Sequence, residues 1–141
     1  MKVLLFLSLF LSLSCAHQKS SSGLADAKID IDVKEVKLKN GLTVLMVENP
    51  KLPIFSIYMF YKVGGKNERP GITGASHFLE HMMFKGTKKL KSGDFSAKVA
   101  ALGGRDNAFT SKDYTAYFQQ IEKSRLEDVM ALEADRMQNL T

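Results

Sequence analysis

One stretch of the sequence decides the fold: residues 74–86, which read GASHFLEHMMFKG. Its apolar residues recur at three- and four-residue spacing, which predicts one helix over most of this stretch, with Gly86 as its stop. At 100° per residue, His77, Glu80 and His81 share one face of that helix. The apolar side chains fall on the opposite face, so we expect the helix to bury that face in the core.

The polar face of this helix has the donors of a catalytic metal site. Two histidines one turn apart can bind one zinc ion through ring nitrogens at roughly 2.0–2.1 Å. Glu80 lies beside such a metal and can take a proton from a water molecule that attacks a peptide carbonyl. The pattern therefore predicts His77 and His81 as ligands and Glu80 as a general base. The alternative, from these residues alone, is two ordinary helix histidines beside a surface glutamate.

The residues before this helix predict strands. Loosely alternating runs at 33–38 and 42–47 flank Asn40-Gly41, a dipeptide that favours a hairpin turn. The third run, 54–63, is apolar almost throughout, and we expect it to be buried on both faces. Beyond the helix, the pattern predicts further helices at 95–102 and 125–140 and strands or a hairpin at 107–110 and 114–121. This order indicates an α+β fold, a layer in which a mostly antiparallel sheet packs against helices.

The composition of the 141 residues, 45% hydrophobic and 25% charged, is that of one globular domain. The formal net charge is +5, and four lysines fall within the seven residues 85–91. Such a run is typical of a solvated surface loop. Because the sequence has no basic stripe interleaved with aromatic residues, we expect no nucleic-acid partner.

Residues 1–14 predict an export signal. A short positive start precedes an apolar stretch at 3–13, which is too short to span a bilayer permanently. Two cleavage sites compete: one after Ala16, and a lipobox at 11–15 that would make Cys15 the lipidated first residue. Because Cys15 is the only cysteine and precedes a polar tract, we favour the lipoprotein. Ser12 departs from the usual lipobox leucine.

The helix motif does not stand alone. The chain resembles the inverted zincins, the HxxEH metallopeptidase family of pitrilysin, insulin-degrading enzyme and mitochondrial processing peptidase. The resemblance follows the family's order over most of the chain and rests on these stretches: Asn40-Gly41-Leu42, Gly64-Gly65, Glu68, residues 74–87, residues 107–110, Asp113-Tyr114-Thr115 and residues 132–137.

This resemblance implies a zinc endopeptidase with His77 and His81 as zinc ligands and Glu80 as the base. Its substrate would be an extended peptide or a small unfolded protein that adds to an edge strand. The residues of that substrate-binding strand would be Asn107, Ala108, Phe109 and Thr110. The resemblance also implies a homo- or heterodimer with a related family member.

The family's third zinc ligand is a glutamate roughly 70–80 residues beyond the second histidine, which falls after Thr141. We therefore divide the chain into an export signal (1–14), a polar linker (15–27) and the truncated N-terminal part of a peptidase domain (28–141). We expect these residues alone to be inactive, and the protein to be exported to a bacterial envelope and anchored in a membrane through Cys15. The alternatives are a non-catalytic peptide-binding or partner subunit of the same family, or a truncated product without function.

Overall fold

The computed structural model describes residues 30–141, so the predicted signal, Cys15 and the linker up to residue 27 lie outside the described residues. The chain divides into two compact units, with the boundary between Glu48 and Asn49. Each unit is described by itself.

The first unit is an antiparallel hairpin of β1 (Val33–Lys37) and β2 (Thr43–Val47). The turn closes where the N–H of Leu38 donates to the carbonyl of Leu42 at 2.8 Å. Gly41 lies in that turn with φ of +88°, a conformation that strongly favours glycine. The hairpin predicted from the Asn-Gly pair is therefore present.

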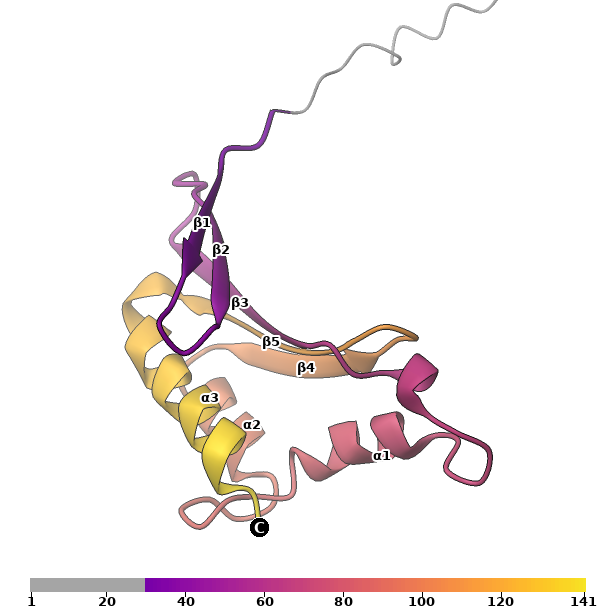
Figure 1. Ribbon diagram of the computed structural model, residues 1–141. Coiled ribbons are helices and arrows are strands. Elements are labelled where there is room, and N and C mark those ends of the chain that lie inside the picture. Colours follow the sequence, from indigo (N-terminus) through magenta and orange to yellow (C-terminus); the bar gives the residue numbers. More distant parts are fainter. Residues whose placement is uncertain (1–29) are drawn as a thin grey trace, which may run out of the picture. The chain divides into compact units, whose positions relative to one another are not determined.

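The second unit has a three-stranded antiparallel sheet in the order β3 (Ile54–Tyr61), β5 (Thr115–Glu122) and β4 (Arg105–Thr110), seen in Figure 1. Its helices are α1 (Ala75–Met82), α2 (Asp94–Ala101) and α3 (Leu126–Asn139). Short 3-10 turns, Gly65–Asn67 and Lys123–Arg125, precede α1 and α3 in the sequence. The α+β fold predicted from the sequence is confirmed. Within residues 30–141, no helix has the length and apolar character that a bilayer span requires.

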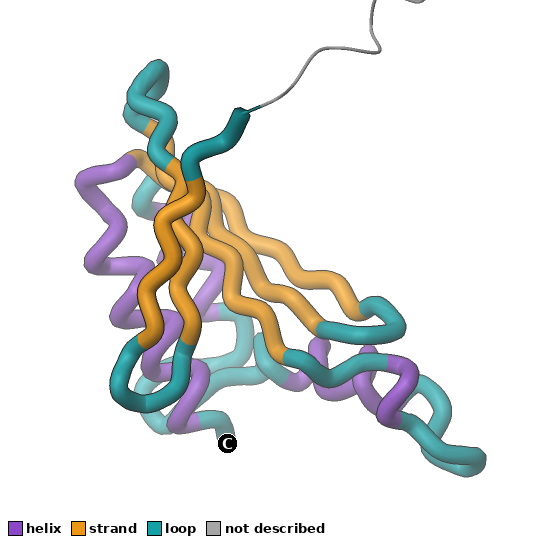
Figure 2. Tube along the Cα trace, turned by 45° about the horizontal axis from the view of Figure 1, so that its top comes forward, coloured by secondary structure: helices purple, strands orange, loops and turns teal. Residues whose placement is uncertain are grey.

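All three helices lie on the same face of the three-stranded sheet, below β4 and β5 in Figure 1, and Figure 2 shows the same elements coloured by type. Each makes one polar contact with a residue on that face. The pairs are Glu80 of α1 with Thr110, Ser96 of α2 with Asp106, and Glu133 of α3 with Gln119. Beneath these contacts lies an apolar cluster of Leu90, Phe95 and Val99, with Leu132 packed against it.

The expectation that residues 54–63 are buried on both faces is wrong. Among the described residues β3 is an edge strand of the three-stranded sheet, and its residues alternate between exposed and half-buried. On the face opposite the three helices, aromatic rings contact one another: Tyr58 stacks on Phe118 with centroids 5.1 Å apart, and Phe60 meets Tyr114 edge-on at 5.4 Å. The run is apolar on both sides because one side packs on the helices and the other forms this aromatic surface.

The expectation that α1 buries its apolar face is also wrong. Phe78 is 65% exposed and Leu79 is 60% exposed, whereas Ser76 and Glu80 are buried. The helix has turned its Ser76–Glu80 side toward the sheet, because the carboxylate of Glu80 forms its hydrogen bond there with Thr110. The buried side of the helix is therefore the side that carries this polar contact, although the apolar residues predict the opposite side.

Arg136 joins α3 to the elements around α1. It is 1% exposed, pairs with Glu133, and its guanidinium lies 4.1 Å from the ring centroid of Phe95 and 4.6 Å from that of Tyr117. The centroid of the Phe84 ring, just beyond the end of α1, lies 5.3 Å from the same guanidinium. Burial raises the pKa of the Glu133 carboxyl, and the Arg136 charge opposes that rise. Removing one member of such a buried pair typically costs about 3–5 kcal/mol of stability.

Candidate metal centre

The start of α1 is fixed by a residue outside the helix. Gly74 precedes the first turn with φ of +90° and has no side chain to cap it. Glu68 supplies the missing acceptor: its Oε2 accepts from the N–H of Gly74 at 2.8 Å and its Oε1 from that of Ser76 at 2.9 Å. These backbone hydrogen bonds lower the pKa of the Glu68 carboxyl. A negative charge at a helix N-terminus is stabilised by the helix dipole.

The segment that leads to Glu68 packs on the loop between β4 and β5. The N–H of Gly65 donates to the carbonyl of Ser111 at 3.0 Å, and that of Lys66 to the carbonyl of Lys112 at 2.9 Å. A Cβ added to Gly64 would lie 2.4 Å from the Ser111 carbonyl oxygen. Only glycine allows this approach, so Gly64 sets the distance between the β3–α1 connection and the β4–β5 loop.

The three predicted site residues converge on one side of α1. The Nε2 atoms of His77 and His81 are 3.2 Å apart, and the two rings are tilted by 52°. With a carboxylate oxygen of Glu80, these donor atoms all lie within 4.8 Å of one another. Both histidines are exposed, whereas Glu80 is 8% exposed. In residues 30–141, no other group of three histidine, cysteine or acidic side chains gathers in this way.

The spacing of the two imidazoles fits a tetrahedral metal ion. Two nitrogens bonded to one zinc at roughly 2.0–2.1 Å, with a tetrahedral angle between them, are separated by about 3.3–3.4 Å. The observed 3.2 Å between the Nε2 atoms is close to that value. Imidazole nitrogens also suit zinc better than they suit magnesium or calcium, which prefer oxygen ligands. The residues present therefore fit a zinc ion.

Glu80 is held by the sheet. The hydroxyl of Thr110, the last residue of β4, donates to Glu80 Oε2 at 2.5 Å. Thr115 pairs with Thr110 across the hairpin, with 3.3 Å between the two hydroxyl oxygens, and its own hydroxyl donates to the carbonyl of Val63 at 2.9 Å. The neighbouring Tyr117 hydroxyl stays neutral, because burial above all raises its pKa to about 12.

The predicted substrate-binding strand is β4, an edge strand of the sheet among the described residues. Its side chains do not act alike. The amide oxygen of Asn107 accepts from the N–H of Ala108 at 2.9 Å, and Phe109 joins the aromatic face. Thr110 points to Glu80 instead. The structure thus brings Thr110 to Glu80, one of the three residues of the candidate metal site.

Sequence reasoning did not find the contacts of Glu68, Thr115 and the Val63 carbonyl. The contact between Thr110 and Thr115 could have been predicted from the sequence, because the two residues close the predicted hairpin and must face each other in register. The contacts of Glu68 could not be predicted from periodicity, because Glu68 lies in an irregular loop and its partners are six and eight residues further along the chain.

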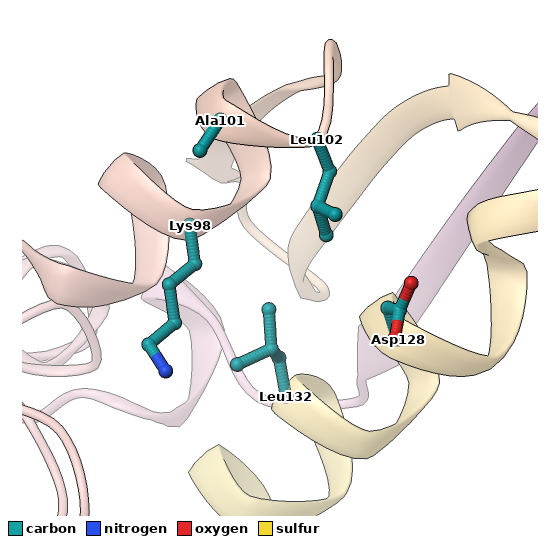
Figure 3. A pocket seen from close by; sticks show the side chains of 5 residues that line it. All are labelled: Lys98, Ala101, Leu102, Asp128 and Leu132. Atoms are coloured by element: carbon teal, nitrogen blue, oxygen red, sulfur yellow. The ribbon is translucent and has the colours of Figure 1, made fainter.

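A separate shallow groove lies between α2 and α3 (Figure 3). It is lined by Lys98, Ala101, Leu102, Asp128 and Leu132. None of the metal-site residues takes part in it, and its lining has no nucleophile or metal-ligating cluster.

Comparison with known proteins extends these observations. The family model "Insulinase (Peptidase family M16)" matches residues 43–141. The zinc protease PqqE of Helicobacter pylori is 43% identical over 109 residues, which cover 76% of this chain and 24% of that protein. Among solved structures, a protease from Helicobacter pylori is 40% identical with a TM-score of 0.75, over 79% of this chain and 27% of that one. Pitrilysin is 27% identical with a TM-score of 0.69, over 81% of this chain and 12% of that one. The chain thus spans about a quarter or less of these relatives.

Replacement of Glu68 by glutamine tests the anchor at the start of α1. We expect Glu68→Gln to lower the melting temperature at pH 7, because it removes the charge and one of the two strong acceptors. The folded-state pKa of Glu68 is lowered, so its contribution is present above its unfolded pKa of about 4.3 and is lost as the pH falls through the folded value. The deficit should therefore shrink in acid, as thermal melts at several pH values would record.

The matched control is Glu35→Gln, at an exposed position of β1, which should leave the melting temperature unchanged. A Glu68→Gln protein whose deficit is the same at pH 7 and at pH 3 would show that the carboxylate charge does not hold the helix.

Proposed function

Because the chain belongs to the insulinase family, peptidase family M16, we propose that the full-length protein is a zinc-dependent endopeptidase that cleaves extended peptides. Family membership confirms the resemblance found in the sequence. The observation that carries the proposal is the pair of exposed imidazole nitrogens 3.2 Å apart with a buried carboxylate beside them. The proposed activity, substrate and partners are those of the whole protein. The two Helicobacter pylori relatives are about four times as long as the part of each that matches this chain.

In this proposal His77 and His81 hold the zinc ion. When bound, zinc polarises the peptide carbonyl and lowers the pKa of water, which makes water a nucleophile near neutral pH. Glu80 accepts the proton of the attacking water and then delivers it to the leaving nitrogen. Its carboxylate is fixed by Thr110 on one oxygen, which leaves the other oxygen for this proton transfer.

A catalytic zinc site typically takes three protein ligands. The described residues supply two histidines, and the third member of their cluster is the proposed base. We therefore place the third ligand outside the described residues and expect residues 30–141 alone to bind zinc weakly and to be inactive.

We place the substrate along β4. An extended peptide gains main-chain hydrogen bonds when it adds to a sheet edge, and it would lie beside α1, which contacts this strand through Glu80 and Thr110. An incoming carbonyl would replace the Asn107 amide oxygen at the N–H of Ala108. The phenyl ring of Phe109 is part of the aromatic face on the other side of the sheet.

The Glu80→Gln variant of the full-length protein tests the assignment of the base. We expect it to keep one zinc per chain and to lose turnover by about 10²- to 10⁴-fold, the usual contribution of a general base. The measurements are zinc content by mass spectrometry and cleavage of an unfolded peptide. Normal turnover would refute Glu80 as the base.

Two companion proteins complete this experiment. His77→Ala should lose zinc as well as activity, and Glu127→Gln, at an exposed site on α3, should resemble the wild type. A wild-type protein with one zinc per chain that cleaves no unfolded peptide would instead favour a non-catalytic partner subunit.

Two peptides of one sequence test strand addition to β4. N-methylation at alternate residues blocks the amides on one side of an extended chain, and methylation in the other register blocks the opposite side. We expect one register to weaken binding at least about 10-fold, because it removes the ladder hydrogen bonds, and the other to bind like the unmethylated peptide. Equal binding by both methylated peptides would contradict strand addition.

Export and lipidation are proposals that rest on residues 1–15. We propose that the protein reaches the bacterial envelope and is anchored in a membrane through Cys15. Cells fed a palmitate analogue should label the wild-type protein but not Cys15→Ala. Equal label in the two proteins would overturn the anchor, and Ser14→Ala, which keeps the cysteine, serves as the control.

A further inference from the structure

Glu80 could take either of two roles at this site, metal ligand or general base. A carboxylate can ligate zinc as readily as it can act as a base. Its oxygen and the two imidazole nitrogens lie within 4.8 Å of one another, whereas two donors on one tetrahedral zinc ion are separated by about 3.4 Å. A small side-chain movement would therefore bring Glu80 onto the metal and close the coordination position that water needs.

The contact that opposes this movement comes from β4. The hydroxyl of Thr110 donates to Glu80 Oε2 at 2.5 Å, and this is a hydrogen bond to a charged acceptor, the stronger kind. Thr110 is the last residue of β4 and is paired in register with Thr115 of the central strand. Because Glu80 is buried, water competes little for that carboxylate oxygen.

A count of protons shows that Thr110 acts alone in this contact. Each threonine hydroxyl has one proton to donate. Thr115 donates its proton to the Val63 carbonyl at 2.9 Å, and Thr110 donates its own to Glu80. The 3.3 Å contact between the two hydroxyl oxygens is then left without a proton, so Thr115 is a neighbour of Thr110 and not a second donor to the carboxylate.

We propose that Thr110 is a positioning residue whose hydroxyl holds the Glu80 carboxylate off the metal, so that Glu80 remains a base. This assigns Thr110 a different task from the peptide contact expected of it in the sequence. The inference rests on the proposed zinc site, but its test does not depend on peptide cleavage.

Cobalt(II) in place of zinc supplies the test, because its visible absorption reports the number and type of ligands. In the full-length protein, Thr110→Val keeps the shape of the side chain and removes the hydroxyl. We expect its cobalt spectrum to differ from that of the wild type, because the freed carboxylate joins the ligand set. Thr110→Ser, which retains a hydroxyl, should restore the wild-type spectrum.

Thr115→Val is the matched control. It makes the same change on the facing residue, which does not bond to Glu80, so its cobalt spectrum should be that of the wild type. In a Glu80→Ala background, Thr110→Val should have no effect on the spectrum, since no carboxylate is there to move. A Thr110→Val protein with an unchanged spectrum, or a spectral shift that persists without Glu80, would overturn the proposal.

Kinetics give a second, separate measurement. We expect Thr110→Val to lower kcat about 10- to 100-fold, in line with the loss of a hydrogen bond to a charged group, and to leave KM within about 2-fold. Thr110→Ser should recover most of the activity. An increase in KM with an unchanged kcat would assign Thr110 to substrate binding and refute the positioning role. A wild-type protein without peptidase activity would contradict the proposed function, and the cobalt spectra would still decide the role of Thr110.

Discussion

A carboxylate buried against a β-sheet sets the orientation of the helix that bears the proposed metal ligands. Glu80 is the only acidic residue of α1, and burying it without a partner would be costly. Its hydrogen bond with Thr110 meets that cost only when one side of the helix faces β4. With that side fixed, both histidines project into solvent, and the helix's large apolar residues are exposed as well.

Three elements hold this helix along its length. Glu68 binds its first turn from the preceding loop, and Thr110 binds its middle from β4. Just beyond its end, Phe84 packs on Arg136 of α3. The helix that carries the two histidines is thus held by contacts with a loop, a strand and a distant helix, and the isolated helix would have none of them.

Much of this could be predicted from the sequence. Periodicity placed the α-helices and strands of the second unit close to their observed bounds, except that α1 ends at Met82 and not at Gly86. The His77–His81 spacing predicted that these two side chains lie on one side of α1 together with Glu80, as they do. Which side of α1 faces the sheet could not be predicted. The periodicity shows which side of the helix is apolar, but it does not show the hydrogen bond between Glu80 and Thr110, which lies on the opposite side. The exposure of Tyr58 and Phe60 was missed for a related reason. An apolar run shows that both faces of a strand carry apolar side chains, but it does not show that other elements pack on both faces.

The close approach of Gly64 to Ser111 has a genetic consequence. The backbone at Gly64 is extended, with φ of −166°, so its dihedral angles would tolerate any residue, yet a side chain would meet the Ser111 carbonyl oxygen. Any missense change there must push apart the two loops on either side of that contact, one of which joins Thr110 to Thr115. Gly64 is thus a position where loss-of-function alleles would arise without altering any group that takes part in the chemistry.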